Sequence, residues 1–336
     1  MAIKSYRQAI REALFQEMAR DQRVVVIGED VAGGLGAKGE QDAWGGPMGV
    51  TKGLIGTYGK QRVLDTPISE SAFIGAAVGA AACGLRPVAE LQFIDFLGVC
   101  LDQIINQAAK MRYMFGGRTS IPMVVRTMYG AGLQGASQHS QSLYSIFTHI
   151  PGLKVALPSN PYDAKGLMVQ AIRDNDPVIF CEHKTLYDMT AEVPDESYAI
   201  PFGEANVVRE GDDVTIIAFG RMVHHATAAA DKLAAEGITC TVVDPRTTSP
   251  LDRETILETA AETGRVVIVD EAHPRCGMAA DVSALIAQEA FGDLKAPIRL
   301  VTGLHSPVPF SPPLEALYLP NPEKVEAAVR SVLAGA

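Results

Sequence analysis

The sequence predicts two α/β domains, each built on a doubly wound parallel sheet. Short, continuous apolar runs recur along the chain, as in strands buried on both faces, and segments with helical spacing of apolar residues separate them. Strands that alternate with helices favour such sheets. A chain of 336 residues is too long for one compact core. Because the alternation lapses once, we expect a first domain at 1–185, a linker at 186–203 and a second domain at 204–336.

The first domain is expected to open with a helix at residues 5–20, where Ile10, Leu14 and Met18 recur at helical spacing. A continuous apolar run at 24–28 indicates the first buried strand. Further strands are expected at 87–93, 123–126, 154–157 and 178–182. Helices are expected between them at 69–83, 101–113 and 161–173.

The second domain repeats this alternation after a linker that contains Pro194 and Pro201. Its strands are expected at 214–219, 239–243, 265–270 and 298–301, and its helices at 222–236, 253–263, 278–291 and 322–333. Four strands and four helices are enough for a complete smaller α/β domain.

Composition and charge exclude several classes of protein. The net charge of −10, without a basic block, argues against binding to nucleic acid or to an anionic membrane surface. No apolar run reaches the roughly 20 residues that cross a bilayer, and the first residues lack the apolar stretch of a signal peptide. The five cysteines are scattered and odd in number. They are expected to be buried free thiols, which predicts a cytoplasmic protein.

Glu70 is the most informative charged residue, because it stands in the first turn of the helix expected at 69–83. Pro67 and Ser69, as N-cap, mark the start of this helix. The following residues 75–84 carry no charge and few large side chains, so the helix is expected to be buried and closely packed. A buried, ionised carboxylate aimed into a crevice could serve an acid–base step on a cofactor ring. Alternatively, Glu70 only complements the helix dipole.

Three further motifs could carry chemistry. Residues 34–39 fit the G-x-G-x-x-G pattern of nicotinamide dinucleotide sites, but a long Gly-rich loop follows instead of the required helix, which favours a loop. His139 lies in a Gly- and Ser-rich loop at 130–142, where parallel sheets keep catalytic residues, although a loop histidine is often only structural. Gln92 and Phe96 come at and after the end of a buried strand, where they could hold a flat ring.

Seven spaced sequence blocks occur in one order, at residues 28–31, 65–70, 138–141, 151–155, 163–167, 172–177 and 246–252. With these blocks the chain resembles, over essentially its whole length, the beta subunits of thiamine-diphosphate-dependent 2-oxo acid dehydrogenases. The resemblance implies a transketolase-like fold, with a pyrimidine-binding domain followed by a transketolase C-terminal domain.

Within that family, the segments at 39–54, 112–117 and 180–184 are most similar to the acetoin-cleaving branch. This similarity implies an oxidoreductase component that cleaves acetoin and passes the two-carbon acyl unit to lipoamide. The alternative is a component that oxidatively decarboxylates pyruvate or a branched-chain 2-oxo acid.

The resemblance also implies roles for individual residues. Glu70 matches the glutamate that hydrogen-bonds the aminopyrimidine nitrogen of thiamine diphosphate, and His139 matches a histidine that donates a proton or stabilises charge during acyl transfer. Gln92 and Phe96 match positions that line the aminopyrimidine pocket, with Phe96 standing where some relatives have tyrosine. A structural potassium site is implied near the backbone of the following residues: Ile121, Met123, Ala171 and Asp174, with Asp176 nearby.

The family motif for diphosphate and magnesium is absent from this sequence. The resemblance therefore implies that an alpha subunit holds the magnesium and the diphosphate, in an alpha2–beta2 heterotetramer with its active site at the subunit interface. A lipoyl-bearing acyltransferase is the implied second partner. A different class of function also remains open, in which this chain is a structural or docking subunit with a vestigial site.

Overall fold

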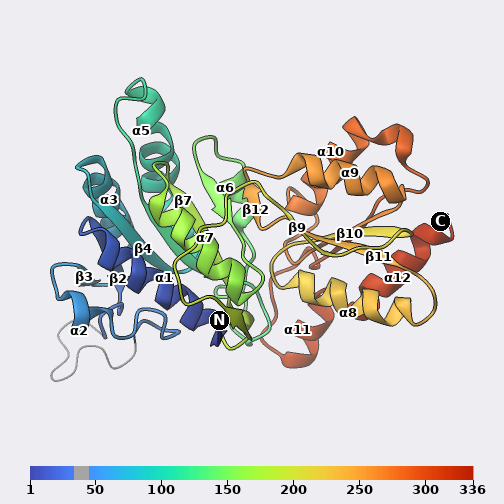
Figure 1. Cartoon of the computed structure of the whole chain (residues 1–336), viewed down its shortest axis with the longest axis horizontal. Coiled ribbons are helices and arrows are strands. Elements are labelled where there is room, and N and C mark those ends of the chain that lie inside the picture. The colour runs from blue at the N-terminus through green and yellow to red at the C-terminus, as the bar shows by residue number, and fades with distance from the viewer. Residues whose placement is uncertain (34–44, 336) are drawn as a thin grey trace. The chain divides into compact units, whose positions relative to one another are not determined.

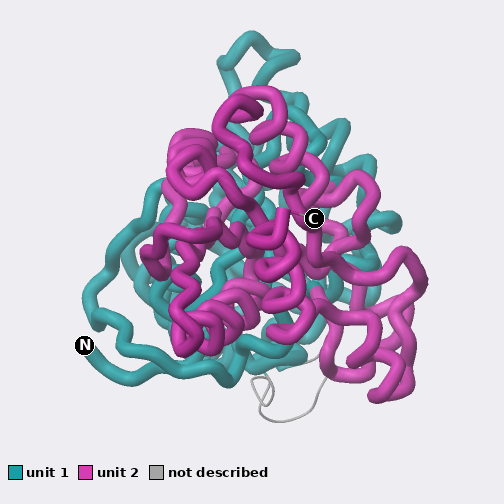
Figure 2. Tube along the Cα trace, turned by 90° about the vertical axis from the view of Figure 1, so that its right-hand side faces the viewer, with its two compact units in different colours: residues 1–129, 146–202 teal, residues 130–145, 203–336 magenta. Residues whose placement is uncertain are grey.

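The computed structural model describes residues 1–33 and 45–335. The G-x-G-x-x-G pattern at 34–39 and the first part of the 39–54 segment, up to residue 44, lie outside the described residues. The chain forms two compact units, coloured separately in Figure 2. Unit 1 comprises residues 1–129 and 146–202, and unit 2 comprises residues 130–145 and 203–336. Residues 186–202 thus belong to unit 1, and the loop that carries His139 belongs to unit 2.

Unit 1 is built on a parallel sheet, which confirms the predicted doubly wound α/β class. Its six strands have the order β6-β7-β5-β4-β2-β3. They are β2 (Val24–Glu29), β3 (Val63–Thr66), β4 (Arg86–Phe93), β5 (Val124–Tyr129), β6 (Lys154–Ala156) and β7 (Val178–His183). All residues of β5 and β7 are buried, as expected for central strands covered on both faces. The short strand β3 was not predicted.

Helices cover both faces of this sheet (Figure 1). They are α1 (Tyr6–Arg20), α2 (Leu54–Tyr58), α3 (Glu70–Ala82), α4 (Leu97–Asp102), α5 (Ala109–Met114), α6 (Tyr144–Thr148) and α7 (Pro161–Arg173). A capping box between Ser5 and Gln8 fixes the start of α1. The single helix predicted at 101–113 is instead interrupted by a π-helical stretch, Gln103–Ala108, next to the non-helical backbone of Cys100.

Residues of the predicted linker form one more strand. This strand, β8 (Thr190–Val193), pairs antiparallel with β1 (Ala2–Ser5) at the start of the chain. The pairing brings together segments that are far apart in the sequence, so neither strand was predicted from local pattern.

Helix α3 was expected to be buried, but in the structure only part of its surface is buried. Phe73, Ile74, Ala77 and Val78 are buried, but Ala76 and Gly79 on another face are exposed. One face of α3, formed by small residues, is therefore exposed to solvent in this single chain.

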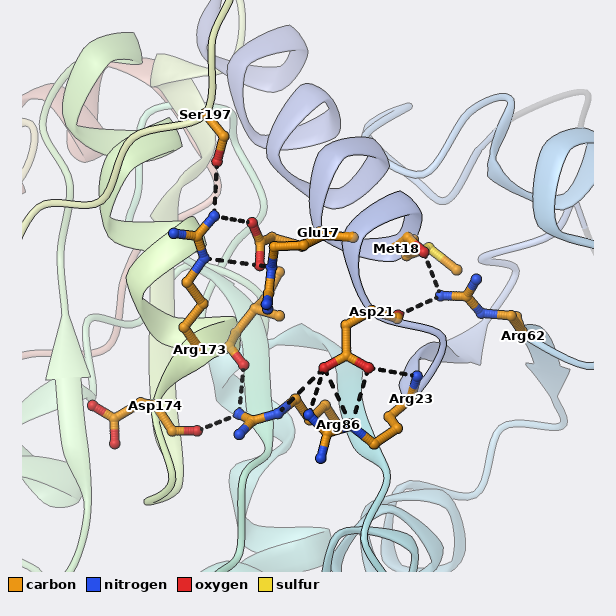
Figure 3. Close-up of polar contacts among 11 residues, drawn as sticks. Glu17, Met18, Asp21, Arg23, Arg62, Arg86, Arg173, Asp174 and Ser197 are labelled. Carbon is orange, nitrogen blue, oxygen red and sulfur yellow. Dashed lines mark hydrogen bonds and ion pairs between the residues drawn. The ribbon is translucent and has the colours of Figure 1, made fainter.

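Charged side chains close the amino edge of the unit 1 sheet (Figure 3). The Glu17 side chain has no exposed surface and accepts hydrogen bonds from Arg173 Nε at 3.0 Å and Nη2 at 2.6 Å. Asp21 pairs with Arg23 just before β2, and this hydrogen bond lowers the pKa of Asp21 to about 2. Arg86 donates to the carbonyls of Ile172 and Asp174. These contacts tie the end of α1 to α7 and β4.

Unit 2 contains a five-stranded sheet with the order β14-β13-β10-β11-β9. Its strands are β9 (Asn206–Arg209), β10 (Val214–Ala218), β11 (Cys240–Asp244), β13 (Val266–Asp270) and β14 (Arg299–Thr302), and β12 (Thr247–Ser249) is a further short strand. Helices α8 (Met222–Ala234) and α12 (Pro322–Leu333) pack on one face, and α9 (Arg253–Thr263) and α10 (Met278–Glu289) on the other (Figure 1). The four predicted strands and helices are confirmed. The antiparallel edge strand β9 and helix α11 (Pro312–Tyr318) were not predicted.

The cysteines are all free, but only three are buried. Cys83 and Cys276 are exposed, so the expectation of burial is wrong for these two. Among the described residues, no helix is long and apolar enough to cross a membrane.

Candidate functional site

Glu70 lies at the carboxyl edge of the unit 1 sheet, where open parallel sheets bind their ligands. It is the first residue of α3, which follows β3, and only 9% of its surface is exposed. Ser69 occupies the N-cap position, but its hydroxyl donates to the Pro67 carbonyl at 3.0 Å instead of capping the helix. The N-terminus of a helix carries a partial positive charge, and Glu70 stands in the first turn of α3.

A second carboxylate, Glu29, accompanies Glu70 at this edge. Glu29 is the last residue of β2 and lies beside Thr66 of β3. Burial, together with the charges of Asp30 and Glu70, raises the pKa of Glu29. Burial and the charge of Glu70 also raise the pKa of the Cys100 thiol, in α4, to about 12. The raised pKa values of Glu29 and Cys100 mean that a second negative charge close to Glu70 is unfavourable.

Gln92 and Phe96 lie at the same edge. Gln92 is half-buried near the end of β4, and Phe96 ends the 3₁₀ turn Ile94–Phe96 that follows. The Phe96 ring packs edge-to-face against Phe93 with 5.6 Å between ring centroids. One carboxylate, one amide and one aromatic ring suit a flat nitrogen heterocycle, because the carboxylate can hydrogen-bond a ring nitrogen while the aromatic ring packs nearby.

Behind Gln92 lies a buried ionic cluster that the sequence did not reveal. Arg126 of β5 pairs with Glu90 of β4 and with Glu182 of β7, and the Arg126 Nε–Glu182 Oε1 distance is 2.7 Å. The Tyr187 hydroxyl also donates to Glu182 at 2.7 Å. These residues and Gln92 line one small internal cavity. Charged residues inside apolar strands were the available sequence signal.

His139 lies in the loop of unit 2 and is half-buried. Its backbone N–H donates to the Ala136 carbonyl at 3.4 Å. The neighbouring Ser137 and Gln141 line an open cavity of about 470 Å³ together with His273 and His305, all within unit 2. His139 and Glu70 thus belong to different units of the chain.

Three buried carboxylates of unit 2 surround this loop and were also missed. Asp270 ends β13, Glu271 follows it, and Glu315 lies in α11. All three accept hydrogen bonds from residues of the loop segment 130–145. For Asp270 and Glu271, the sequence signal was an acidic pair at the end of a buried strand.

The residues expected at a potassium site already have partners. The Ile121 carbonyl accepts the Met123 N–H, the Met123 carbonyl accepts the Val178 N–H, and the Asp174 carbonyl accepts Arg86. Ala171 is buried within α7. The Asp174 and Asp176 carboxylates pair with Lys154, and Asp176 also with Arg112. These cations compensate the charge of the two carboxylates, but none of these contacts tests the backbone carbonyls as ligands of a metal ion, so the potassium site stays a prediction. Over residues 1–33 and 45–335, no cluster of three His, Cys, Asp or Glu side chains could hold one.

Known protein families match both parts of the chain. The family "Transketolase, pyrimidine binding domain" matches residues 3–190, and "Transketolase, C-terminal domain" matches residues 203–325. These families imply dependence on thiamine diphosphate. Among solved structures, a "Split gene transketolase, inactive beta4 tetramer" superposes with a TM-score of 0.78 and 25% identity over 98% of both chains.

Curated relatives match almost the whole chain. The beta subunit of acetoin:2,6-dichlorophenolindophenol oxidoreductase from Cupriavidus necator is 62% identical over 98% of both chains. The protein of the same name from Bacillus subtilis is 55% identical over 98% of this chain and 97% of its own length. The 2-oxoisovalerate dehydrogenase beta subunit of Bacillus subtilis is 47% identical over 99% of both. The chain therefore belongs to the family of transketolase-like beta subunits of acetoin and 2-oxo acid dehydrogenases.

Proposed function

We propose that this chain is the beta subunit of the thiamine-diphosphate-dependent first component of an acetoin dehydrogenase system. The observation that carries the substrate assignment is the 62% identity to the Cupriavidus necator acetoin oxidoreductase subunit. Relatives named for 2-oxoisovalerate and pyruvate are 47% and 44% identical, which makes these 2-oxo acids the lesser alternative. In this proposal, residues 1–185 would be the pyrimidine-binding domain and residues 204–336 the transketolase C-terminal domain.

Glu70 is proposed to be the group that acts on the cofactor. When bound, thiamine diphosphate would supply a nucleophilic carbon for reaction at the substrate carbonyl. Glu70 would hydrogen-bond a nitrogen of the aminopyrimidine ring and hold a proton there, while Gln92 and Phe96 would orient the ring. Its burial strengthens this hydrogen bond, because little water competes for the carboxylate.

His139 is proposed to act later, by donating a proton or stabilising charge as the acyl unit passes to lipoamide. An alpha subunit would hold the magnesium and the diphosphate in an alpha2–beta2 heterotetramer, and a lipoyl-bearing acyltransferase would receive the acyl unit. A structural potassium ion near the backbone of Ile121, Met123, Ala171 and Asp174, with Asp176 nearby, belongs to the same proposal.

The test is to reconstitute this chain with its alpha subunit and to replace Glu70 by Gln and by Ala. Loss of a positioned acid–base group predicts a rate lower by about 10²- to 10⁴-fold. Glu192→Gln, on an exposed position of β8, serves as a control that should not change the rate. Near-normal turnover by a folded Glu70 variant would refute the proposed role.

The substrate is tested by assaying the same complex with acetoin, pyruvate and 2-oxoisovalerate side by side. We expect acetoin to be turned over fastest, and rates that favour pyruvate would overturn the assignment. The alpha subunit should also be assayed alone. Substantial cleavage without this chain would favour a purely structural role for it.

A further inference from the structure

The loop that carries His139 is attached to unit 2 mainly through its backbone. The Glu315 carboxylate accepts the N–H groups of Gly132 at 2.8 Å and Gln134 at 3.3 Å, and also the Gln134 side-chain amide at 3.4 Å. The Glu271 carboxylate accepts the Ala131 N–H at 2.6 Å and the Ser142 hydroxyl at 3.4 Å. Glu271 thus contacts both ends of the loop, and Glu315 contacts its first turn.

A third carboxylate continues this attachment. Asp270 accepts a short hydrogen bond from the Tyr144 hydroxyl, just after the loop. It is itself fixed by the N–H groups of Ala272 at 2.9 Å and Ala279 at 3.1 Å. Asp270, Glu271 and Glu315 are each at most 2% exposed, so their hydrogen bonds form without competition from water.

The loop needs such contacts because its own backbone does not favour its shape. Gln134 has a φ of 50° and Ala136 a φ of 58°, in the left-handed region that residues with a side chain adopt rarely. Surrounding structure must therefore impose this conformation. Buried carboxylates suit the task, since they accept several N–H bonds at once and hold them more strongly than neutral acceptors do.

We propose that Glu315 and Glu271 are positioning residues that set the place of His139 for acyl transfer. This inference rests on the function proposed above for His139. It gives unit 2 a second, indirect part in the reaction besides His139, because two of its side chains determine the conformation of the loop that carries this residue. Neither carboxylate is proposed to touch the reacting atoms.

The test compares two electron acceptors in the reconstituted complex. Transfer to lipoamide requires His139, whereas reduction of 2,6-dichlorophenolindophenol takes electrons without acyl transfer to lipoamide. Glu315→Gln replaces one acceptor oxygen by an NH₂ group that faces the donors of the loop. Since misplacing a catalytic group by about 1 Å costs roughly 10²-fold, we expect lipoamide-dependent kcat to fall about 10- to 100-fold, and dye reduction by less than about 3-fold.

A second variant perturbs the loop without touching a carboxylate. A Cβ on Gly135 would lie 2.7 Å from the Ser140 hydroxyl oxygen and 3.1 Å from the His139 carbonyl oxygen. Gly135→Ala is therefore expected to give the same selective loss, as is Glu271→Gln. Glu262→Gln, on the exposed face of α9, is the matched control and should change neither rate.

Hydrogen exchange of residues 130–142 provides a readout that does not depend on turnover. Glu315→Gln should speed exchange at the Gly132 and Gln134 amides, and the control should not. An unchanged ratio of the two rates, whether both fall equally or neither falls, would overturn the inference. Unchanged hydrogen exchange would also overturn it. The acceptors can be compared with acetoin or pyruvate, whichever the complex uses. Failure of the acetoin assignment can therefore be distinguished from failure of the inference about Glu315 and Glu271.

Discussion

Replacing Arg126 by Met is expected to destabilise unit 1 strongly. The Arg126 side chain is 3% exposed, and its partners Glu90 and Glu182 are 9% and 0% exposed. Burial raises the pKa of Glu90 even though the charge of Arg126 opposes this shift. Burial would also lower the pKa of Arg126, but the charges of Glu182 and Glu90 outweigh it and raise the pKa. The guanidinium therefore stays charged and compensates both carboxylates.

Removing the only cation of this cluster leaves two buried carboxylates close together. Breaking a buried ion pair from one side costs about 3–5 kcal/mol. For a unit of this size, about 1 kcal/mol lowers the midpoint temperature by roughly 2–4 °C, so we expect Arg126→Met to lower it by about 6–20 °C. Methionine retains most of the side-chain volume, which limits any contribution from a cavity.

The assays are thermal unfolding, for the midpoint temperature, and urea unfolding, for the free energy, of the full chain, both followed by circular dichroism at pH 8 and at pH 5.5. The loss of stability should shrink at the lower pH, because a protonated carboxyl no longer requires a cation. Arg126→Met combined with Glu182→Gln should regain part of the loss, and Arg118→Met at an exposed position should change little. A loss below about 1 kcal/mol, or one that does not depend on pH, would refute the electrostatic reasoning.

Two further stability changes are expected in unit 1. The pKa of Asp21 is about 2, below its unfolded value of 3.8, so its contribution is complete above pH 3.8 and disappears as the pH falls through 2. Because Arg23 is 58% exposed, Asp21→Asn should cost only about 1 kcal/mol at pH 7 and a small part of that at pH 2, where folded Asp21 is half protonated, as measured by urea unfolding. A Cβ on Gly152 would lie 2.1 Å from the Ala109 carbonyl oxygen, at a φ of 101°. Gly152→Ala should therefore cost more than the roughly 1–2 kcal/mol of positive φ alone, whereas Gly237→Ala, with a φ of 83° and open space, should cost only that amount.

Controls separate these effects from general damage. Asp212→Asn, in an exposed turn, should leave the free energy of unfolding unchanged at both pH values. A cost of Asp21→Asn that persisted undiminished at pH 2 would contradict the assignment to its ionised form. Equal costs for Gly152→Ala and Gly237→Ala would show that the turn at Gly152 moves freely away from α5.

Helix limits were predictable where the start signals are local. Helices α7, α9 and α12 span the predicted residues. Each is preceded by an Asn or Asp whose side chain accepts a backbone N–H of the first turn, namely Asn160, Asp252 and Asn321. Such caps are encoded by residue types at fixed spacing, so the sequence alone suffices.

Elements that depend on distant partners were not predictable in this way. Strand β8 exists because it pairs with β1, and its own residues alternate poorly between buried and exposed. The loop 130–145 follows a strand of unit 1 but belongs to unit 2, since the carboxylates that hold it come from β13, the residue after it and α11. Propensity and periodicity describe neighbours in sequence and carry no information about such partners.

The candidate site was predicted in part for the same reason. Glu70 stands out because a lone acid begins a helix of small residues, which is visible locally. Glu29 and Glu315 do not stand out, because their surroundings are assembled by the fold: Glu29 from the pairing of β2 with β3, and Glu315 from a loop that precedes it by about 180 residues.

The two edges of the unit 1 sheet differ in how their buried or half-buried acidic side chains are paired. At the amino edge, Glu17 and Asp21 are each paired with arginine. At the carboxyl edge, neither Glu29 nor Glu70 forms an ion pair with any residue that the structure describes, and their mutual repulsion contributes to the raised pKa of Glu29. A fold selected only for stability would be expected to compensate these acids as it does at the other edge. Leaving them uncompensated suits a site whose hydrogen-bond donors arrive with a ligand, such as the nitrogen ring of a bound cofactor.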